Sequence, residues 1–222
     1  MSVVKPRLLD LFCGAGGCTK GYQRAGFEVV GVDLAAQPNY CGEVFHRGDA
    51  LEIGQRLLDS EDFDAIHASP PCPAYSRASH YHGVQANHPD LVGPTRDLLN
   101  QTGLPWVIEN VPGSPVRRDL VLCGEMFGLR VHRHRYFETE GFFAMQPPHG
   151  RHTLKGADHN CHIEEGVARL VAGNYANHED AADAMGIDWK ISRRELANAI
   201  PPAYTEHIGG YLMAAVQGRV AA

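Results

Sequence analysis

One cysteine, Cys72, lies in a proline-rich stretch, Ser69-Pro70-Pro71-Cys72-Pro73-Ala74-Tyr75-Ser76. The prolines fix φ and remove backbone donors, so we expect this segment to be stiff. It follows the apolar run Phe63 to Ala68, which is typical of a short buried strand. Because open α/β sheets bind ligands beyond the carboxyl ends of their strands, Cys72 is a candidate nucleophile. Taken alone, a small apolar cysteine in a turn would be the simpler interpretation.

A carboxylate is expected at the same edge of the sheet. Glu109 and Asn110 follow a second apolar run, Leu104 to Ile108. Burial there would raise the pKa of the Glu109 carboxyl and make it a proton donor near neutral pH. The alternative is a glutamate that caps a helix or forms a salt bridge.

Two arginines, Arg133 and Arg135, supply positive charge further along the chain. In an extended strand both would project to one face, with His132, His134 and Tyr136 on the other. Two guanidinium groups on one face suit a phosphate or a polarised base carbonyl. A solvated edge strand is the alternative interpretation.

The elements that position these groups begin with a βαβ unit. Arg7 to Phe12 is predicted as a strand, Thr19 to Ala25 as a helix, and Phe27 to Val32 as a second strand that ends at Asp33. Between the first strand and the helix lies a glycine turn, Cys13-Gly14-Ala15-Gly16-Gly17. Such glycines let the backbone approach a ligand, and a carboxylate at the second strand's end binds ribose hydroxyls. The G-x-G-G spacing favours an adenosine cofactor smaller than a dinucleotide, although such turns also occur for steric reasons.

Asp49 ends a further strand, Val44 to His46, and precedes a helix from Ala50 to Asp59. It is a second candidate for binding the adenosine, and it could also cap the helix. Downstream, helices are predicted from Pro94 to Gln101, around Glu179 to Met185, after a capping box at Ser192 to Glu195, and from Pro201-Pro202 to about Gln217.

Composition limits the class of protein. The 222 residues, 44% of them hydrophobic and 21% charged, describe one ordinary globular domain with room for a small appendage. No apolar run approaches a membrane span, and Met1 to Arg7 lack the apolar core of a signal peptide. The six cysteines show no CxxC pairing, so a reduced, cytoplasmic protein is expected. The net charge of −6 weakens non-specific nucleic-acid binding but leaves a local basic face possible.

A histidine-rich region occupies the loosely patterned segment from Gly141 to Gly173. Its potential zinc ligands are His149, His152, His159, Cys161 and His162. Their spacing matches no standard zinc ligand set, so a polar loop that faces nucleic acid is the favoured interpretation and no metal is predicted.

Together these segments resemble the cytosine-C5 DNA methyltransferase family. The matching segments are Asp10-Leu11-Phe12-Cys13-Gly14-Ala15-Gly16-Gly17, Asp33, Gly48-Asp49, Pro70-Pro71-Cys72 with Ser76, Glu109-Asn110-Val111, Arg133-x-Arg135, and Asn198-Ala199-Ile200-Pro201-Pro202. They occur in the family's order over residues 8–212, and the compact size together with Cys123 to Leu129 resembles small bacteriophage members. A phage or bacterial cytoplasm is the implied location.

The resemblance implies an α/β, Rossmann-like fold, a mostly parallel sheet with helices on both faces, that binds S-adenosyl-L-methionine. Phe12 would stack on the adenine, Asp33 would bind the ribose, Asp49 would contact the adenine amino group and Pro70 would line the pocket. The other implied cofactor residues are Asp10, Gly14, Gly16, Gly17, Leu34 and Asn198. Cys72 would attack C6 of a flipped cytosine in DNA, Glu109 would act at N3, Arg135 and Arg133 would bind the O2 side or a phosphate, and Ser76 and Asn110 would contact the substrate.

The sequence departs from the family pattern at Pro73, Val131 and Ala197, where the family usually has Gln, Gln and Gly. The catalytic domain is predicted as residues 1–140 plus 176–222, which leaves only 141–175 as a rudimentary target-recognition insert. A protein partner is therefore a candidate source of sequence specificity. Two alternatives remain open: the same chemistry on RNA or a free cytosine nucleotide, and a non-catalytic DNA-binding homologue.

Overall fold

The structure is a computed structural model that describes residues 4–71, 90–152 and 177–220. Cys72 and Ser76 lie outside the described residues, as do His159, Cys161 and His162. No helix within the described ranges is long and apolar enough to cross a membrane.

A seven-stranded sheet forms the centre of the fold, in the order β3-β2-β1-β4-β5-β7-β6. Its strands are β1 (Arg7–Leu11), β2 (Glu28–Asp33), β3 (Val44–Arg47), β4 (Ala65–Ala68), β5 (Trp106–Asn110), β6 (Leu120–Leu122) and β7 (Arg135–Glu140). The first five strands are parallel, and β7 runs antiparallel to both β5 and β6. Because the strand order reverses between β1 and β4, the ends of these two strands form the topological switch point at which such sheets bind ligands.

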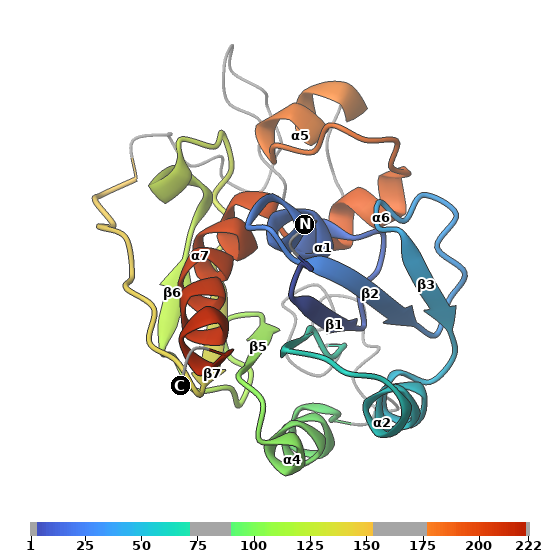
Figure 1. Ribbon diagram of the computed structural model, residues 1–222. Coiled ribbons are helices and arrows are strands. Elements are labelled where there is room, and N and C mark those ends of the chain that lie inside the picture. The colour runs from blue at the N-terminus through green and yellow to red at the C-terminus, as the bar shows by residue number, and fades with distance from the viewer. Residues whose placement is uncertain (1–3, 72–89, 153–176, 221–222) are drawn as a thin grey trace.

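Helices cover both faces of the sheet (Figure 1). They are α1 (Gly17–Arg24), α2 (Ala50–Ser60), α4 (Val92–Thr102), α5 (His178–Ala184), α6 (Arg193–Asn198) and α7 (Pro202–Val220), with a 3-10 turn, η1 (Gly124–Phe127). Alternating strand residues supply the two cores: Leu8 packs with Tyr22 of α1 and Ile208 of α7, and Leu9 with Leu57 of α2 and Leu99 of α4. The predicted mostly parallel α/β fold is confirmed.

Helices α1 and α7 pack closely because small residues face each other. A Cβ built on Gly21 of α1 would meet the carbonyl oxygen of Pro202 and the hydroxyl of Thr205, and one on Gly209 of α7 would meet the Cβ of Ala25 at 2.6 Å. This contact brings the Asn198-to-Pro202 segment next to the glycine turn. The predicted capping box is present: Ser192 Oγ accepts from the Glu195 amide at 3.4 Å, and Glu195 Oε2 accepts from the Ser192 amide at 2.6 Å.

Candidate active site

Asp33 joins the glycine turn to the end of β2. Its Oδ2 accepts a hydrogen bond from the Gly14 amide at 3.0 Å, and its Oδ1 accepts one from the Ala35 amide at 2.9 Å. A carboxylate offers about four acceptor positions, so these two bonds leave capacity for ribose hydroxyls. The side chain is half-buried at the carboxyl edge of the sheet, as predicted for a ribose-binding carboxylate.

The turn itself is left-handed at Phe12 (φ 61°) and Gly14 (φ 52°). Phe12 is the one non-glycine residue with positive φ in the described ranges, and such strain is concentrated at functional sites. The space where a Gly14 side chain would stand is open, which suits a ligand in close contact with the backbone. Gly17 differs, because a Cβ there would collide with the backbone carbonyl of Ile200; its role in the structure is to allow helix packing.

Asp10 lies beneath this turn and has no exposed surface. The hydroxyl of Thr19 donates to Asp10 Oδ2 at 2.6 Å, which connects β1 to α1. Burial raises the pKa of the Asp10 carboxyl to about 7, against the opposing effect of the Thr19 bond. Such burial favours a role in shaping the turn over the predicted direct contact with a cofactor.

The Asp10 pKa leads to a prediction for stability. An acid whose pKa is raised on folding is deprotonated more easily in the unfolded chain, so its contribution to stability falls as pH rises from about 4 to about 7. Asp10→Asn removes this titration and keeps an oxygen for Thr19. We expect the melting temperature of the variant minus that of the wild type, measured without ligands, to increase across this pH range and then level off. A difference that is constant with pH would contradict the prediction.

Three further predicted cofactor residues lie at or near the ends of elements. Asp49 caps α2, and its Oδ1 accepts from the amides of Leu51 and Glu52 at 2.9 and 3.1 Å. Leu34 follows β2 with 71% of its surface exposed. Asn198 is exposed as the last residue of α6.

The predicted acid, Glu109, is 5% exposed and lies within β5, which extends to Asn110. Arg135 Nε lies 3.0 Å from Glu109 Oε1, because β7 pairs antiparallel with β5. Burial raises the pKa of Glu109, although Arg135, Ser69 and Arg133 act in the opposite direction. The salt bridge considered as an alternative is thus present, yet the carboxyl still holds its proton more strongly than one in water.

The predicted arrangement of the two arginines was wrong. β7 begins at Arg135, so Arg133 precedes the strand and strand alternation does not apply to the pair. Arg133 is 7% exposed, and its Nη2 donates to the carbonyl of Ala197 at 2.7 Å. Its own carbonyl accepts from the Tyr204 hydroxyl at 2.7 Å, so Arg133 also connects this edge to α6 and α7.

The segment that leads to Cys72 is fixed from the neighbouring strand. Asn110 Nδ2 donates to the carbonyl of Pro70 at 3.1 Å, and Asn110 Oδ1 accepts from the Val111 amide at 2.8 Å. Both Pro70 and Asn110 are buried. The Asn110 side chain therefore makes protein contacts that place Pro70 beside Glu109, and its contact with a substrate stays a prediction.

A buried polar chain at this edge was missed. The ring of His67 in β4 contacts the Tyr22 hydroxyl through Nδ1 at 3.0 Å and the Ser69 hydroxyl through Nε2 at 2.9 Å. Burial lowers the pKa of His67 to about 3, so the ring is neutral. The sequence signal for this chain was His67, a polar residue inside the apolar run from Phe63 to Ala68. Its contact holds the Ser69 side chain in place next to Pro70.

Comparison with known proteins identifies a family that part of the chain matches. Residues 6–115 match the family described as C-5 cytosine-specific DNA methylase. Type II methyltransferase M.AplI of Arthrospira platensis is 35% identical over 80 residues, which is 31% of this chain and 21% of that protein. Type II methyltransferase M.FnuDI of Fusobacterium nucleatum is 34% identical over 84 residues, 35% of this chain and 24% of that protein. The chain thus matches about a fifth to a quarter of the length of these relatives.

Among solved structures, the Entamoeba histolytica methyltransferase EhMeth superposes with a TM-score of 0.65 at 14% identity, over 96% of this chain and 99% of that one. This likeness concerns the fold, which is that of a methyltransferase. The match places residues 6–115 of the chain in the C-5 cytosine-specific DNA methylase family. The family and the fold support S-adenosyl-L-methionine as the cofactor.

Proposed function

We propose that this chain transfers a methyl group from S-adenosyl-L-methionine to C5 of cytosine in DNA. The observation that carries the proposal is the buried Glu109–Arg135 pair, 3.0 Å apart, next to the Pro70 segment and on the same sheet as the glycine turn. Because β1 to β5 are parallel, their carboxyl ends lie at one edge of the sheet. The proposed cofactor residues and the proposed catalytic residues therefore share that edge.

The turn residues fit the proposed cofactor. Gly14 is open toward ligand, the Asp33 carboxylate retains acceptor capacity for a ribose, and Leu34 and half-buried Phe12 offer apolar surface for an adenine ring. Asp49 would accept from the adenine amino group while it caps α2. The bound cofactor supplies an electrophilic methyl group on a sulfonium centre.

In the proposed mechanism the Cys72 thiolate forms a bond to C6 of the cytosine, and the ring electrons move toward C5 and N3. Glu109 donates a hydrogen bond or its proton at N3, which stabilises the charge that develops there. C5 would then take the methyl group from the sulfonium centre, which leaves as a neutral thioether. Solvent water would accept the C5 proton, and the C6–S bond would break with its electron pair returning to sulfur, which restores the ring and the thiolate. Any proton donated at N3 would return to Glu109. Arg135 holds the Glu109 carboxyl in position and would bind the O2 side of the base.

The recognition of DNA is proposed to depend on residues 141–175, with residues 1–140 and 176–222 as the catalytic domain. Cytosine must leave the duplex to reach a thiol at the sheet edge, so base flipping is part of the proposal. A segment of this size is small for sequence readout, and a protein partner would then add specificity.

The test is methyl transfer from labelled cofactor to three acceptors: duplex DNA, RNA and dCMP. We expect label in duplex DNA alone, and bisulfite sequencing of DNA from cells that express the protein should locate it at C5 of cytosine. Label in RNA or dCMP but not in DNA would establish the alternative substrate. Cofactor binding with no transfer to any acceptor would indicate a non-catalytic homologue.

A further inference from the structure

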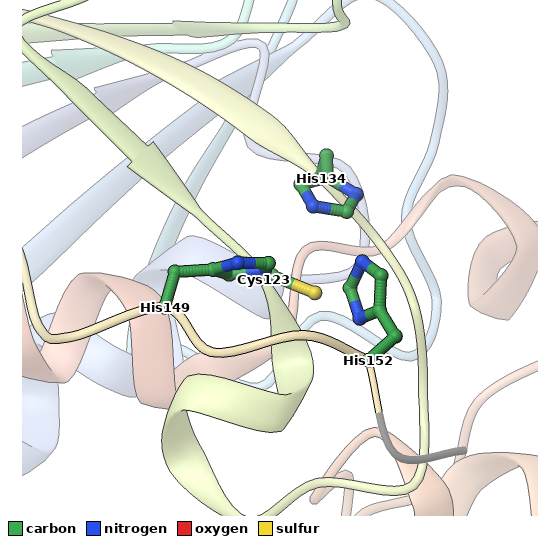
Figure 2. Close-up of side chains that lie close together, drawn as sticks. All are labelled: Cys123, His134, His149 and His152. Carbon is green, nitrogen blue, oxygen red and sulfur yellow. The ribbon is translucent and has the colours of Figure 1, made fainter.

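Four potential metal ligands converge beside the catalytic sheet (Figure 2). Cys123 follows β6, His134 immediately precedes β7, and His149 and His152 lie in the segment after β7. Their potential ligand atoms all lie within 4.8 Å of one another. Figure 2 shows the three imidazole rings arranged around the Cys123 sulfur, although the residues come from three separate parts of the chain.

We propose that Cys123, His134, His149 and His152 bind one structural zinc ion. One thiolate and three imidazoles are ligands that zinc prefers, and four protein ligands describe a closed, tetrahedral site. Zinc–nitrogen and zinc–sulfur bonds of about 2.0–2.3 Å place tetrahedral ligand atoms about 3.3–3.6 Å apart. Separations of up to 4.8 Å therefore require only small side-chain rotations to close on the ion.

An acidic residue next to the cluster supports this assignment. Glu125 Oε2 contacts His152 Nδ1, which leaves Nε2 of His152 as the nitrogen for a metal. Glu125 Oε1 also lies 3.3 Å from His132 Nε2. Zinc-bound histidines usually pair their second nitrogen with a carboxylate or carbonyl, and this pairing fixes the tautomer and ring orientation.

The ligand cluster is partly sheltered from solvent. Cys123 has no exposed surface, and His134 is half-buried, with its ring 5.4 Å from that of His149 and 5.1 Å from that of His152. A neutral imidazole is the form that binds zinc. Three crowded rings around one sulfur would repel each other if protonated, whereas a cation between them would bring them together.

This ligand set differs from the histidine-rich region considered in the sequence. His149 and His152 are shared, while Cys123 and His134 replace His159, Cys161 and His162, which lie outside the described residues. The spacing C-x10-H-x14-H-x2-H matches no standard zinc-ligand spacing, so the sequence alone did not indicate this set. Antiparallel pairing of β7 with β6 brings Cys123 and His134 together.

A zinc ion here would fix the start of the proposed recognition segment to the catalytic sheet. His134 immediately precedes Arg135, whose Nη1 donates to the His134 carbonyl at 2.8 Å. His149 and His152 lie just before residue 153, where the described range ends. The site would therefore hold the recognition segment next to the Glu109–Arg135 pair.

The test is zinc content by mass spectrometry of the full chain, purified with added zinc and then dialysed. We expect one zinc ion per chain, lost in Cys123→Ser and in His149→Ala, and retained in the matched control Cys161→Ser. Glu125→Gln is expected to weaken zinc affinity about 10–100-fold without changing the ligands.

Cobalt provides a readout that does not depend on stability. Cobalt(II) in the wild-type site should show a thiolate-to-cobalt charge-transfer band and the intense visible bands of tetrahedral coordination, and Cys123→Ser should remove the charge-transfer band. A zinc-free wild-type protein would overturn the proposal. So would zinc that is lost in Cys161→Ser but retained in folded Cys123→Ser.

Discussion

Replacement of Cys72 by serine is expected to abolish methyl transfer while the protein still binds S-adenosyl-L-methionine. Addition to C6 requires a thiolate, and a serine hydroxyl is not ionised near neutral pH. Removal of a covalent nucleophile lowers turnover on the order of 10⁴-fold or more. The measurement is a comparison of initial rates on duplex DNA, with cofactor affinity determined by calorimetry as the control for folding.

We expect Cys72→Ser to lose methyl transfer but to keep cofactor binding, because the neighbouring contacts do not depend on the thiol. Pro70 is fixed by the Asn110 amide at 3.1 Å, and the glycine turn is held by Asp33 from another strand. Neither contact involves the Cys72 thiol, so the substitution leaves them in place.

A covalent trap provides an independent measurement of the Cys72 prediction. DNA with 5-fluorocytosine should form a persistent adduct with the wild type, because fluorine at C5 cannot leave as a proton does. The serine variant should form no adduct. Turnover by Cys72→Ser within tenfold of the wild type would contradict the assigned nucleophile.

Local patterns predicted much of this molecule. Four of the five parallel strands, β1, β2, β4 and β5, appeared as short apolar runs, and the Ser192 capping box was predicted from four consecutive residues. Asp33 and Glu109 were placed at the ends of strands for the same reason, since the carboxyl ends of parallel strands meet at one edge.

Contacts between distant segments were not predictable in this way. Arg133 contacts Ala197, 64 residues away. Cys123 lies near His149 because the segment after β7 contacts β6, where the Val121 amide donates to Gln146 Oε1 at 2.8 Å. The position of β7 thus determines that Arg135 pairs with Glu109 and that Arg133 contacts Ala197. β7 begins at Arg135, so Arg133 lies outside the strand. Side chains alternate between the two faces only within a strand, and the expected orientation of Arg133 therefore did not hold.

Glu109→Gln is expected to lower kcat by about 10²–10⁴-fold, the usual contribution of a positioned acid. Glutamine keeps the size of the side chain but has no proton to transfer and does not stabilise charge at N3 as an acid does. Burial raises the pKa of Glu109, so its protonated form persists to higher pH than in water. If Glu109 acts as the donor, wild-type kcat should fall as pH rises through that pKa, and the variant should lack this decline.

The chain offers a matched control in Glu138, a buried carboxylate on β7 that also pairs with arginine. Arg96 Nη2 lies 2.7 Å from Glu138 Oε2, and the Arg117 amide donates to the same oxygen at 2.9 Å. Although burial acts in the opposite direction, these bonds lower the pKa of Glu138, so it stays ionised where Glu109 holds a proton. Glu138→Gln should thus reduce the free energy of unfolding at least as much as Glu109→Gln, because each removes a buried carboxylate from a partly buried arginine.

The two variants separate a catalytic carboxyl from a structural one. Rates are measured well below both melting temperatures, at saturating cofactor. Glu138→Gln should keep kcat close to that of the wild type, and Glu109→Gln should lose it with little change in cofactor affinity. Equal losses in both variants would contradict a catalytic role for Glu109. Of the two carboxylates, Glu109 is the one that lies beside Pro70 and the segment that leads to Cys72, and the one whose pKa is raised.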